Sequence, residues 1–291
     1  MRLKSKLDEG KFAILAEMEP PKGVDVSTMV ANATRVKERV DAFVVPDMND
    51  AVLRMSSLGG ALILKEKGME PVMQLNCRDR NRLALQADLL AASACGINNI
   101  MVVRGEDVGF GDHHQAKAVY DIELLELLDV TQKLQRGQDM AGIGLSGSPR
   151  FFVGSVVNTA AEGKALDLEL EEMDKKIEEG VQFFVSPPLF DLAFIDPFLK
   201  RVDRRKGRII PTVLLLKSVG MARYIDRNND KIHIPGALIE RLQNARDRVH
   251  ECMRIVAETA STLREEGFGG VHFSTVGWED KLPEMLEGIG I

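Results

Sequence analysis

The chain has 291 residues, 45% of them hydrophobic, so it can bury a sizeable core in one large domain or two small ones. A net charge of −6 and an aromatic content of 5% argue against a nucleic-acid binder, which would show a basic face or a base-stacking platform. No apolar run approaches the roughly 18–20 residues that span a bilayer. These properties predict a protein without a membrane span and without a nucleic-acid partner.

The beginning of the chain and its cysteines indicate the compartment. The stretch MRLKSKLDEGKF is basic, but no apolar segment or cleavage site follows it, so no secretory signal is predicted. Cys77, Cys95 and Cys252 are too few and too scattered for a disulfide framework or a zinc site. We therefore expect a cytoplasmic protein.

Short apolar runs of strand length alternate with longer amphipathic segments along the whole chain. The predicted strands lie within residues 12–20, 42–47, 71–77, 99–105, 151–158, 183–188, 208–218 and 270–278. Eight strand–helix units in a chain of this length predict a (β/α)₈ TIM barrel, for which about 250 residues is typical. A doubly wound sheet is the alternative, which periodicity does not exclude. Without a Pro/Gly/Ser linker, we expect one catalytic domain over residues 1–291.

Helical spacing between these runs indicates which side chains face the core. Two predicted core faces consist of Met29, Ala33, Val36 and Val40, and of Leu83, Ala87, Leu90 and Ala94. The expected helix ends are marked by the caps Asp25 and Ser27 and by the stops Gly68, Gly96 and Gly180. Residues 236–267 predict two helices before the last strand, and residues 106–115 predict a polar loop after the fourth.

Polar side chains recur where the predicted strands end. They are Glu17, Glu19, Asp47, Asn49, Asn76, Arg78, Arg104, Glu106, Asn158 and Ser186. In a (β/α)₈ barrel the loops after the C-terminal ends of the strands build the active site. We therefore expect these groups to converge on one pocket.

The stretch LNCRDRNRLALQADLLAASACGINNIMVVRGED (75–107) resembles the methylenetetrahydrofolate reductase family. Further similar stretches follow the family's order: EMEPPKG (17–23), GDHHQAKAVYD (111–121), FFVGSVVN (151–158), MDKKIEEGVQFFVSPPLFD (173–191) and KSVGMARYI (217–225). The resemblance covers about residues 12–278. It implies the short bacterial form, which has the catalytic (β/α)₈ barrel without a regulatory domain and often forms homo-oligomers.

The resemblance also implies an activity in one-carbon metabolism and methionine biosynthesis. Reduced FAD would pass a hydride to 5,10-methylenetetrahydrofolate, which gives 5-methyltetrahydrofolate. Opening of the imidazolidine ring needs a proton on the departing nitrogen, and a carboxylic acid of raised pKa can supply it. Glu17, three residues before Pro20, stands at the family's position for this acid. Glu19 shares its strand face and is its rival from pattern alone.

Other residues are expected at the cofactor and the pterin. Glu106 stands where the family has an aspartate near pterin and flavin, and Asp107 could take this role if the turn is shifted. The positions that resemble flavin contacts are Gln74, Arg104, Gly105, Glu106, Tyr120, Asn158 and Lys176. Against these roles, Lys176 could belong to a solvated helix face and Tyr120 to the core. We expect Arg78, Asp79, Arg80 and Asn81 to lock their loop by mutual ion pairs and hydrogen bonds.

Three positions depart from the family pattern. Glu106 replaces an aspartate, Pro187 replaces a glutamine that binds the pterin, and Val219 stands near a stacking aromatic. Ser186 is then the expected substitute in substrate binding. The electron donor would be NADH or a partner protein, and the alternative function is a reductase-like subunit of a larger electron-transfer or one-carbon complex. A flavin-free pterin-binding barrel is a third possibility.

Two further groups attract attention without predicting chemistry. The adjacent pair His113 and His114 does not converge on one metal and has no evident third ligand, so we expect a solvated loop and no metal site. Cys77, at a strand end, is expected to be buried and not nucleophilic.

Overall fold

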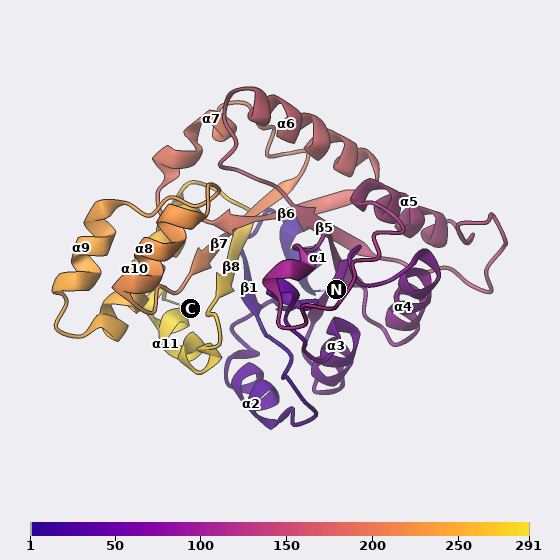
Figure 1. Cartoon of the computed structure of the whole chain (residues 1–291), viewed down its shortest axis with the longest axis horizontal. Helices are drawn as coiled ribbons and strands as arrows, with labels where there is room; N and C mark the ends of the chain where they lie inside the picture. The colour runs from indigo at the N-terminus through magenta and orange to yellow at the C-terminus, as the bar shows by residue number, and fades with distance from the viewer. Residues whose placement is uncertain (1, 291) are drawn as a thin grey trace.

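Eight parallel strands close into a barrel in the computed structural model, which describes residues 2–290. The strands follow one another in chain order from β1 to β8, and β8 pairs with β1. The predicted (β/α)₈ barrel is confirmed, and the doubly wound alternative is wrong because the first and last strands are hydrogen-bonded. Figure 1 shows the helices arranged around the central strands.

All eight predicted strands are present. They are β1 (Ala13–Glu17), β2 (Ala42–Val45), β3 (Pro71–Asn76), β4 (Asn99–Val103), β5 (Phe152–Val156), β6 (Val181–Pro188), β7 (Arg208–Leu214) and β8 (Gly270–Ser274). Most of their residues are buried, because parallel strands are covered by helices outside and by packed side chains inside.

Helices connect the strands and cover the outside of the barrel (Figure 1). The α-helices are α1 (Arg2–Asp8), α2 (Ser27–Val36), α3 (Ser57–Glu66), α4 (Arg82–Ala94), α5 (Leu124–Gln135), α6 (Gly163–Glu178), α7 (Asp196–Leu199), α8 (Val219–Asn228), α9 (Gly236–Asn244), α10 (Arg248–Glu265) and α11 (Leu282–Gly288). Short 3₁₀ turns are η1 (Asn49–Ala51), η2 (Val108–Phe110), η3 (Leu192–Ile195) and η4 (Glu279–Lys281). The two helices expected over 236–267 are α9 and α10, and the expected loop 106–115 contains only the short turn η2.

The N-terminal helix α1 lies across the end of the barrel at which the strands begin and closes its interior. Its Leu3 and Leu7 are fully buried in one cluster with inward-facing strand residues such as Leu15, Met101 and Ile210. This cluster is separate from the larger one between strands and outer helices. The barrel is therefore a packed core, and its reactive groups have to lie at the strand ends.

The predicted helix faces had different outcomes. The face of α2 is confirmed, because Met29, Ala33, Val36 and Val40 are all buried. The face of α4 is wrong: Leu83, Ala87, Leu90 and Ala94 are exposed, while Leu85, Gln86, Leu89 and Ala92 are buried. Helix α4 has apolar residues around most of its circumference, so spacing alone did not show which stripe meets the barrel.

Helix boundaries follow the expected signals. Gly68, Gly96 and Gly180 all have positive φ directly after helices, which confirms them as stops. Asp25 accepts a hydrogen bond from the backbone N–H of Ser27 at 2.9 Å, whereas Ser27 itself is the first residue of α2. Within residues 2–290, no helix is both long and apolar enough to cross a membrane.

Candidate functional site

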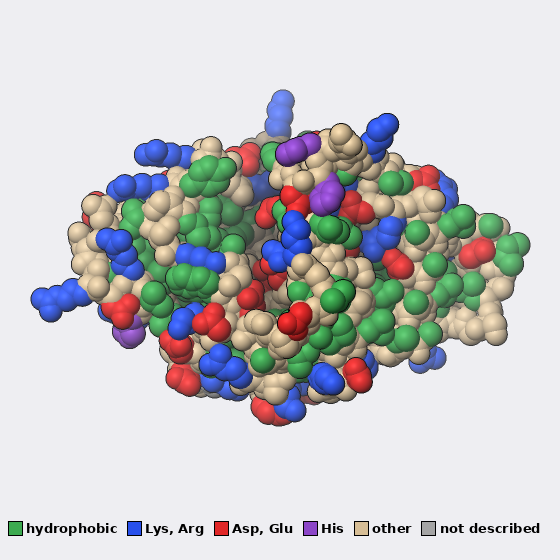
Figure 2. Space-filling model, turned by 60° about the horizontal axis from the view of Figure 1, so that its bottom comes forward, with side chains coloured by type: hydrophobic (Ala, Val, Ile, Leu, Met, Phe, Trp, Pro, Cys, Tyr) green, Lys and Arg blue, Asp and Glu red, His purple; other side chains and the backbone are tan. Residues whose placement is uncertain are grey.

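Backbone strain is concentrated at the C-terminal ends of the strands. Five non-glycine residues within 2–290 have positive φ, namely Met48, Asp50, Ala51, Tyr120 and Val276. All five lie in loops that follow β2, β4 or β8. Such conformations cost free energy and tend to cluster at functional sites. One face of the molecule is hollowed near its centre, and acidic side chains lie along the hollow (Figure 2).

Glu17 is the last residue of β1. It therefore lies at the C-terminal end of the barrel strands, which we call the mouth of the barrel. Its side chain is partly accessible, and Ser274 at the end of β8 donates a hydrogen bond to its Oε1 atom at 3.1 Å. Burial raises the pKa of Glu17 from 4.5 to about 7, and neighbouring carboxylates add to the shift while the Ser274 hydroxyl opposes it. Glu17 can therefore hold a proton near neutral pH and release it to a molecule in the mouth.

Glu19 lies on the same strand face but has a different partner. Its carboxylate forms an ion pair with Arg54 at 2.9 Å. Burial raises the pKa of Glu19, and the guanidinium of Arg54 opposes that shift. Among residues 2–290 no cation is paired with Glu17, so the geometry distinguishes the two rivals and favours Glu17 as the proton donor.

The loop after β2 is stabilised by a buried carboxylate, that of Asp47. It accepts hydrogen bonds from the backbone N–H of Asn76 at 3.0 Å and from the Asn76 amide at 2.8 Å. Arg80 donates to the same carboxylate and forms an ion pair with Asp88 at 2.9 Å. Gln74 accepts the backbone N–H of Asp47 at 2.9 Å through its side-chain oxygen. The ends of β2 and β3 are thus tied together.

Arg78 is almost fully buried and locks the following loops. Its guanidinium binds the carboxylate of Asp79 at 2.7 Å and donates to the carbonyl oxygens of Met48 at 3.0 Å and Glu106 at 3.2 Å. Asn81 caps α4 by accepting the backbone N–H groups of Leu83 and Ala84. The predicted mutual ion pair is present between Arg78 and Asp79, whereas Arg80 pairs with Asp47 and Asp88 outside this group and Asn81 caps the helix.

The structure brings Arg104, Gly105 and Tyr120 together at the end of β4. The Arg104 guanidinium lies 4.6 Å from the centre of the Tyr120 ring and remains largely exposed. The Tyr120 hydroxyl donates to the carbonyl oxygen of Gly105 at 3.2 Å. Gly105 has φ +87°, and a Cβ there would lie 3.0 Å from the Cβ of Arg78, so glycine is needed for both reasons. Glu106 is exposed and ion-paired with Arg78 at 3.5 Å.

Asn158 and Lys176 each form contacts near the end of β5. Glu169 accepts the backbone N–H of Asn158 at 2.9 Å, and the Asn158 side chain caps the turn through Ala160. Lys176 is buried, which is contrary to a solvated helix face. Its ammonium donates to the carbonyl oxygen of Val156 at 3.0 Å and pairs with Glu172 at 2.7 Å. Both residues therefore order this strand end.

The departures from the family pattern have definite surroundings. Ser186 is buried, and its hydroxyl donates to the carbonyl oxygen of Pro187 at 2.8 Å. Pro187 itself is partly accessible at the end of β6. Val219 begins α8 and packs partly buried against the core. The Ser186 hydroxyl can still accept a hydrogen bond from a substrate, whereas donating one would require it to leave the Pro187 carbonyl.

Cys77 and the pair His113 and His114 also follow strands at this end of the barrel. Cys77 is buried as expected, and burial raises the pKa of its thiol to about 12, which disfavours the nucleophilic thiolate. His113 and His114 are exposed, and His113 contacts Asp112 at 2.7 Å. Across residues 2–290, no cluster of three or more His, Cys, Asp or Glu residues is arranged to hold a metal ion.

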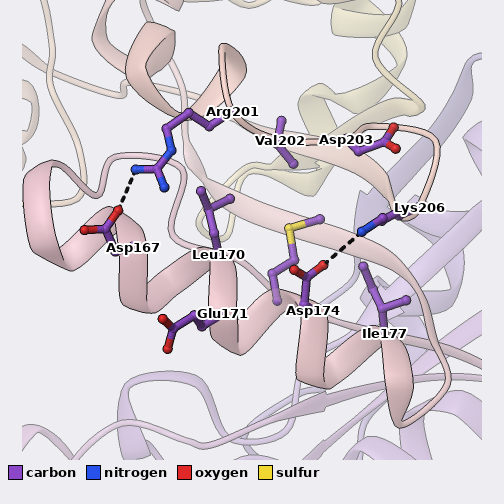
Figure 3. A pocket seen from close by; sticks show the side chains of 10 residues that line it. Asp167, Leu170, Glu171, Asp174, Ile177, Arg201, Val202, Asp203 and Lys206 are labelled. Carbon is purple, nitrogen blue, oxygen red and sulfur yellow. Dashed lines mark hydrogen bonds and ion pairs between the residues drawn. The ribbon is translucent and has the colours of Figure 1, made fainter.

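A separate groove lies between α6 and the segment that follows α7 (Figure 3). Ion pairs at 2.7 Å between Arg201 and Asp167, and at 3.7 Å between Lys206 and Asp174, bridge its two sides. Both of its cations, Arg201 and Lys206, are thus already paired with carboxylates across the groove. It has no candidate proton donor comparable to Glu17, so we place the functional site at the strand ends.

Three groups beside Glu17 are not predicted from the sequence: Asp50 in η1, Ser274 at the end of β8 and Glu279 in η4. Asp50 and Glu279 both raise the pKa of Glu17, and Ser274 hydrogen-bonds to it. The signal for Ser274 was its place at the end of the last predicted strand. Asp50 and Glu279 belong to loop turns, for which the sequence has no periodic signal.

These features define a class: a (β/α)₈ barrel protein with a protonatable carboxyl group and paired acidic and basic residues at the C-terminal ends of its strands. The family model for methylenetetrahydrofolate reductase matches residues 2–290. The chain therefore belongs to the methylenetetrahydrofolate reductase family.

A curated relative has the same family name. The chain is similar to methylenetetrahydrofolate reductase 2 of Schizosaccharomyces pombe, with 22% identity over 233 residues. The match covers 75% of this chain and 35% of the relative. The chain thus spans about a third of the length of that relative, and the comparison concerns that part alone.

Proposed function

We propose that the chain reduces 5,10-methylenetetrahydrofolate to 5-methyltetrahydrofolate with a bound flavin, and that Glu17 is its general acid. The observation that carries the proposal is the partly accessible carboxyl group of Glu17, whose pKa is raised to about 7 at the mouth of a barrel of this family. An ordinary surface glutamate would be almost fully ionised at neutral pH and could not donate a proton efficiently.

The surroundings of Arg104 fit the phosphate part of FAD. The Arg104 guanidinium is exposed, and its weak ion pair with Glu123 at 3.5 Å leaves donors for an anion. Val156, at the end of β5, has 38% of its surface exposed and offers an apolar contact to a ring. We assign Gln74, Gly105, Tyr120 and Asn158 to the same cofactor site on their resemblance to the family.

In the proposed reaction, reduced FAD supplies the hydride when bound, and Glu17 supplies the proton. Glu17 donates its proton to the departing nitrogen of the imidazolidine ring, the carbon–nitrogen bond breaks, and an iminium ion forms at the methylene carbon. Hydride addition to that carbon then gives the methyl group. Because Glu17 remains accessible, it regains a proton from solvent after each turnover.

Glu106 and Ser186 are proposed to bind the pterin. Glu106 is exposed beside Gly105, and its ion pair with Arg78 at 3.5 Å involves one carboxylate oxygen, which leaves the other to accept from the pterin. Pro187 offers no side-chain hydrogen bond, so the pterin contact made there by other members has to come from a neighbour. We infer that residues 1–291 act as one catalytic unit in the cytoplasm, as a homo-oligomer, with NADH or a partner protein as electron donor.

An absorbance experiment tests the proposal. The purified protein, incubated with FAD, should be yellow, and anaerobic addition of methylenetetrahydrofolate should restore the colour after the flavin has been reduced with dithionite. Bleaching by NADH would identify a self-sufficient reductase, whereas indifference to NADH would indicate a partner-fed subunit. A protein that binds no FAD, or a reduced flavin that ignores the folate, would overturn the proposal.

A further inference from the structure

Ser274 and Glu17 meet where the barrel closes between its last and first strands. Leu15 on β1 pairs with His272 on β8, so Glu17 and Ser274 lie two residues further along these neighbouring strands. Side chains two residues apart share a strand face. The serine therefore presents its hydroxyl to the carboxyl group, at an Oγ–Oε1 distance of 3.1 Å.

The backbone holds Ser274 in a fixed place. Its carbonyl oxygen accepts the backbone N–H of Leu215 at 3.0 Å, and its Cα pairs with that of Leu214 on β7. Its side chain is buried. A donor that is fixed on rigid strands can orient an acid more exactly than a donor on a mobile loop.

The other groups around Glu17 act on it in the opposite direction to Ser274. Burial and the carboxylates of Glu19, Asp50 and Glu279 all favour the protonated form. The cations Arg54 and Lys217 act on Glu19.

The remaining titratable neighbour on β8 is His272. Its pKa is lowered to about 4 by burial, so it is neutral at working pH. Thr212 donates its hydroxyl to the carbonyl oxygen of Ser186, which leaves its oxygen to accept from Nδ1 of His272 at 3.1 Å. Among residues 2–290, the side chain of Ser274 donates a hydrogen bond to the Glu17 carboxylate.

We propose that Ser274 is a positioning residue that orients the Glu17 carboxyl group and keeps its proton transferable near neutral pH. A hydrogen bond donated to a carboxylate favours the ionised form. Without it, burial and three neighbouring carboxylates would hold the proton more tightly. An acid that is too weak transfers its proton poorly, so the serine tunes Glu17 toward the pH at which it acts.

The consequence has a definite sign. The hydroxyl group lowers the pKa of Glu17, so Ser274→Ala should raise it by roughly 0.5 to 1 pH unit, the equivalent of one net hydrogen bond. Ser274→Thr retains the hydroxyl group and should restore the wild-type pKa. Ser155→Ala is a matched control, because the buried Ser155 hydroxyl on β5 donates to the carbonyl oxygen of Val102 at 2.9 Å and not to Glu17.

The titration can be measured in the protein without cofactor or substrate. Glutamate labelled with ¹³C at the side-chain carboxyl group gives a resonance for Glu17, assigned by its loss in Glu17→Gln. We expect its midpoint to move upward in Ser274→Ala and to stay in place in Ser274→Thr and Ser155→Ala. An unchanged midpoint in Ser274→Ala would overturn the inference.

A kinetic arm separates positioning from mere packing. This experiment rests on the proposed function. The folate half-reaction should slow in Ser274→Ala, and the alkaline limb of its pH–rate profile should move to higher pH together with the carboxyl titration. A slower reaction with an unchanged alkaline limb would overturn the role of Ser274 in tuning the Glu17 pKa.

If Ser274→Ala does not fold, Ser274→Cys is the second variant. It retains a weak donor and should give a smaller upward shift of the Glu17 titration, and no shift there would overturn the inference. A wild-type protein inert toward the folate, with the expected carboxyl shifts, would refute the function alone.

Discussion

Replacing Glu17 with glutamine tests the proposed proton donor with almost no change of shape. Glutamine retains the size of the side chain but cannot give a proton to the departing nitrogen. Loss of a general acid typically slows a reaction about 10²- to 10⁴-fold. We expect that loss in the oxidation of reduced flavin by methylenetetrahydrofolate, whereas reduction of the flavin should remain nearly intact because it needs no acid at this position.

The structure supplies the magnitude behind this expectation. A shift of the Glu17 pKa from 4.5 to about 7 means that the site favours the protonated form by about 3 kcal/mol relative to water. At pH 7 about half of the molecules would carry the proton, against roughly 0.3% for an exposed glutamate. Above pH 7 the folate half-reaction of the wild type should slow about tenfold per pH unit.

The same shift predicts a pH dependence of stability. Because the folded-state pKa of Glu17 is raised, its stabilising contribution is present below the unfolded-state pKa and is lost as the pH rises through about 7. The wild type should therefore lose up to about 3 kcal/mol of unfolding free energy relative to Glu17→Gln between about pH 4 and pH 8. Urea unfolding of both proteins at several pH values measures this difference.

Stopped-flow absorbance of the two half-reactions, measured separately under anaerobic conditions, is the assay for the acid. Glu19→Gln is the matched control, since Glu19 lies on the same strand face but is paired with Arg54. We expect Glu19→Gln to stay within about tenfold of the wild type in the folate half-reaction, the size expected for loss of one partly exposed ion pair. Equal loss of both half-reactions in Glu17→Gln, or a larger loss in Glu19→Gln, would refute the assignment.

Three further substitutions probe the cofactor site, the mouth and the barrel interior. Arg104→Ala removes an exposed guanidinium and should weaken FAD binding roughly 10- to 100-fold in a fluorescence titration while the fold is retained, and unchanged affinity would exclude Arg104 from the cofactor site. Asp47→Ala leaves the two Asn76 donors without their buried acceptor, while Arg80 keeps Asp88, and should lower the unfolding free energy by about 1–3 kcal/mol in urea, so a neutral effect would contradict the network described. Leu7→Ala empties a fully buried position inside the barrel and should cost about 2–5 kcal/mol by the same measurement, whereas a cost below about 1 kcal/mol would mean that α1 does not seal the interior.

The strands could be predicted from the sequence because parallel strands covered on both sides appear as continuous apolar runs. Periodicity did not choose the buried face of α4, where Leu83 and Leu90 are exposed and Leu85 and Leu89 are buried. Apolar residues on both sides of a helix make this choice depend on tertiary packing. The closure of β8 on β1 likewise depends on contacts between distant parts of the chain.

The candidate site, like the fold, could be predicted in part from the sequence. The positions of Glu17 and of the loop around Arg78 after strands could be predicted from the sequence, and the family resemblance supplied the role proposed for Glu17. The partner Ser274 was not found, because 257 positions separate it from Glu17 and only barrel closure brings the two together. The buried amine of Lys176 was not foreseen either, since its bond to the Val156 carbonyl is invisible to helical spacing. The roles of the site residues toward flavin and folate, and the single domain over residues 1–291, stay predictions.

One measurement tests the central claim most directly. The protein is loaded with FAD, reduced with dithionite without oxygen, freed of excess reductant and mixed with methylenetetrahydrofolate, and the folate products are then quantified by chromatography. The proposed function predicts that the flavin returns to its oxidised spectrum as one 5-methyltetrahydrofolate forms for each flavin oxidised. A flavin that stays reduced, or one that is reoxidised without formation of the methyl product, would contradict it.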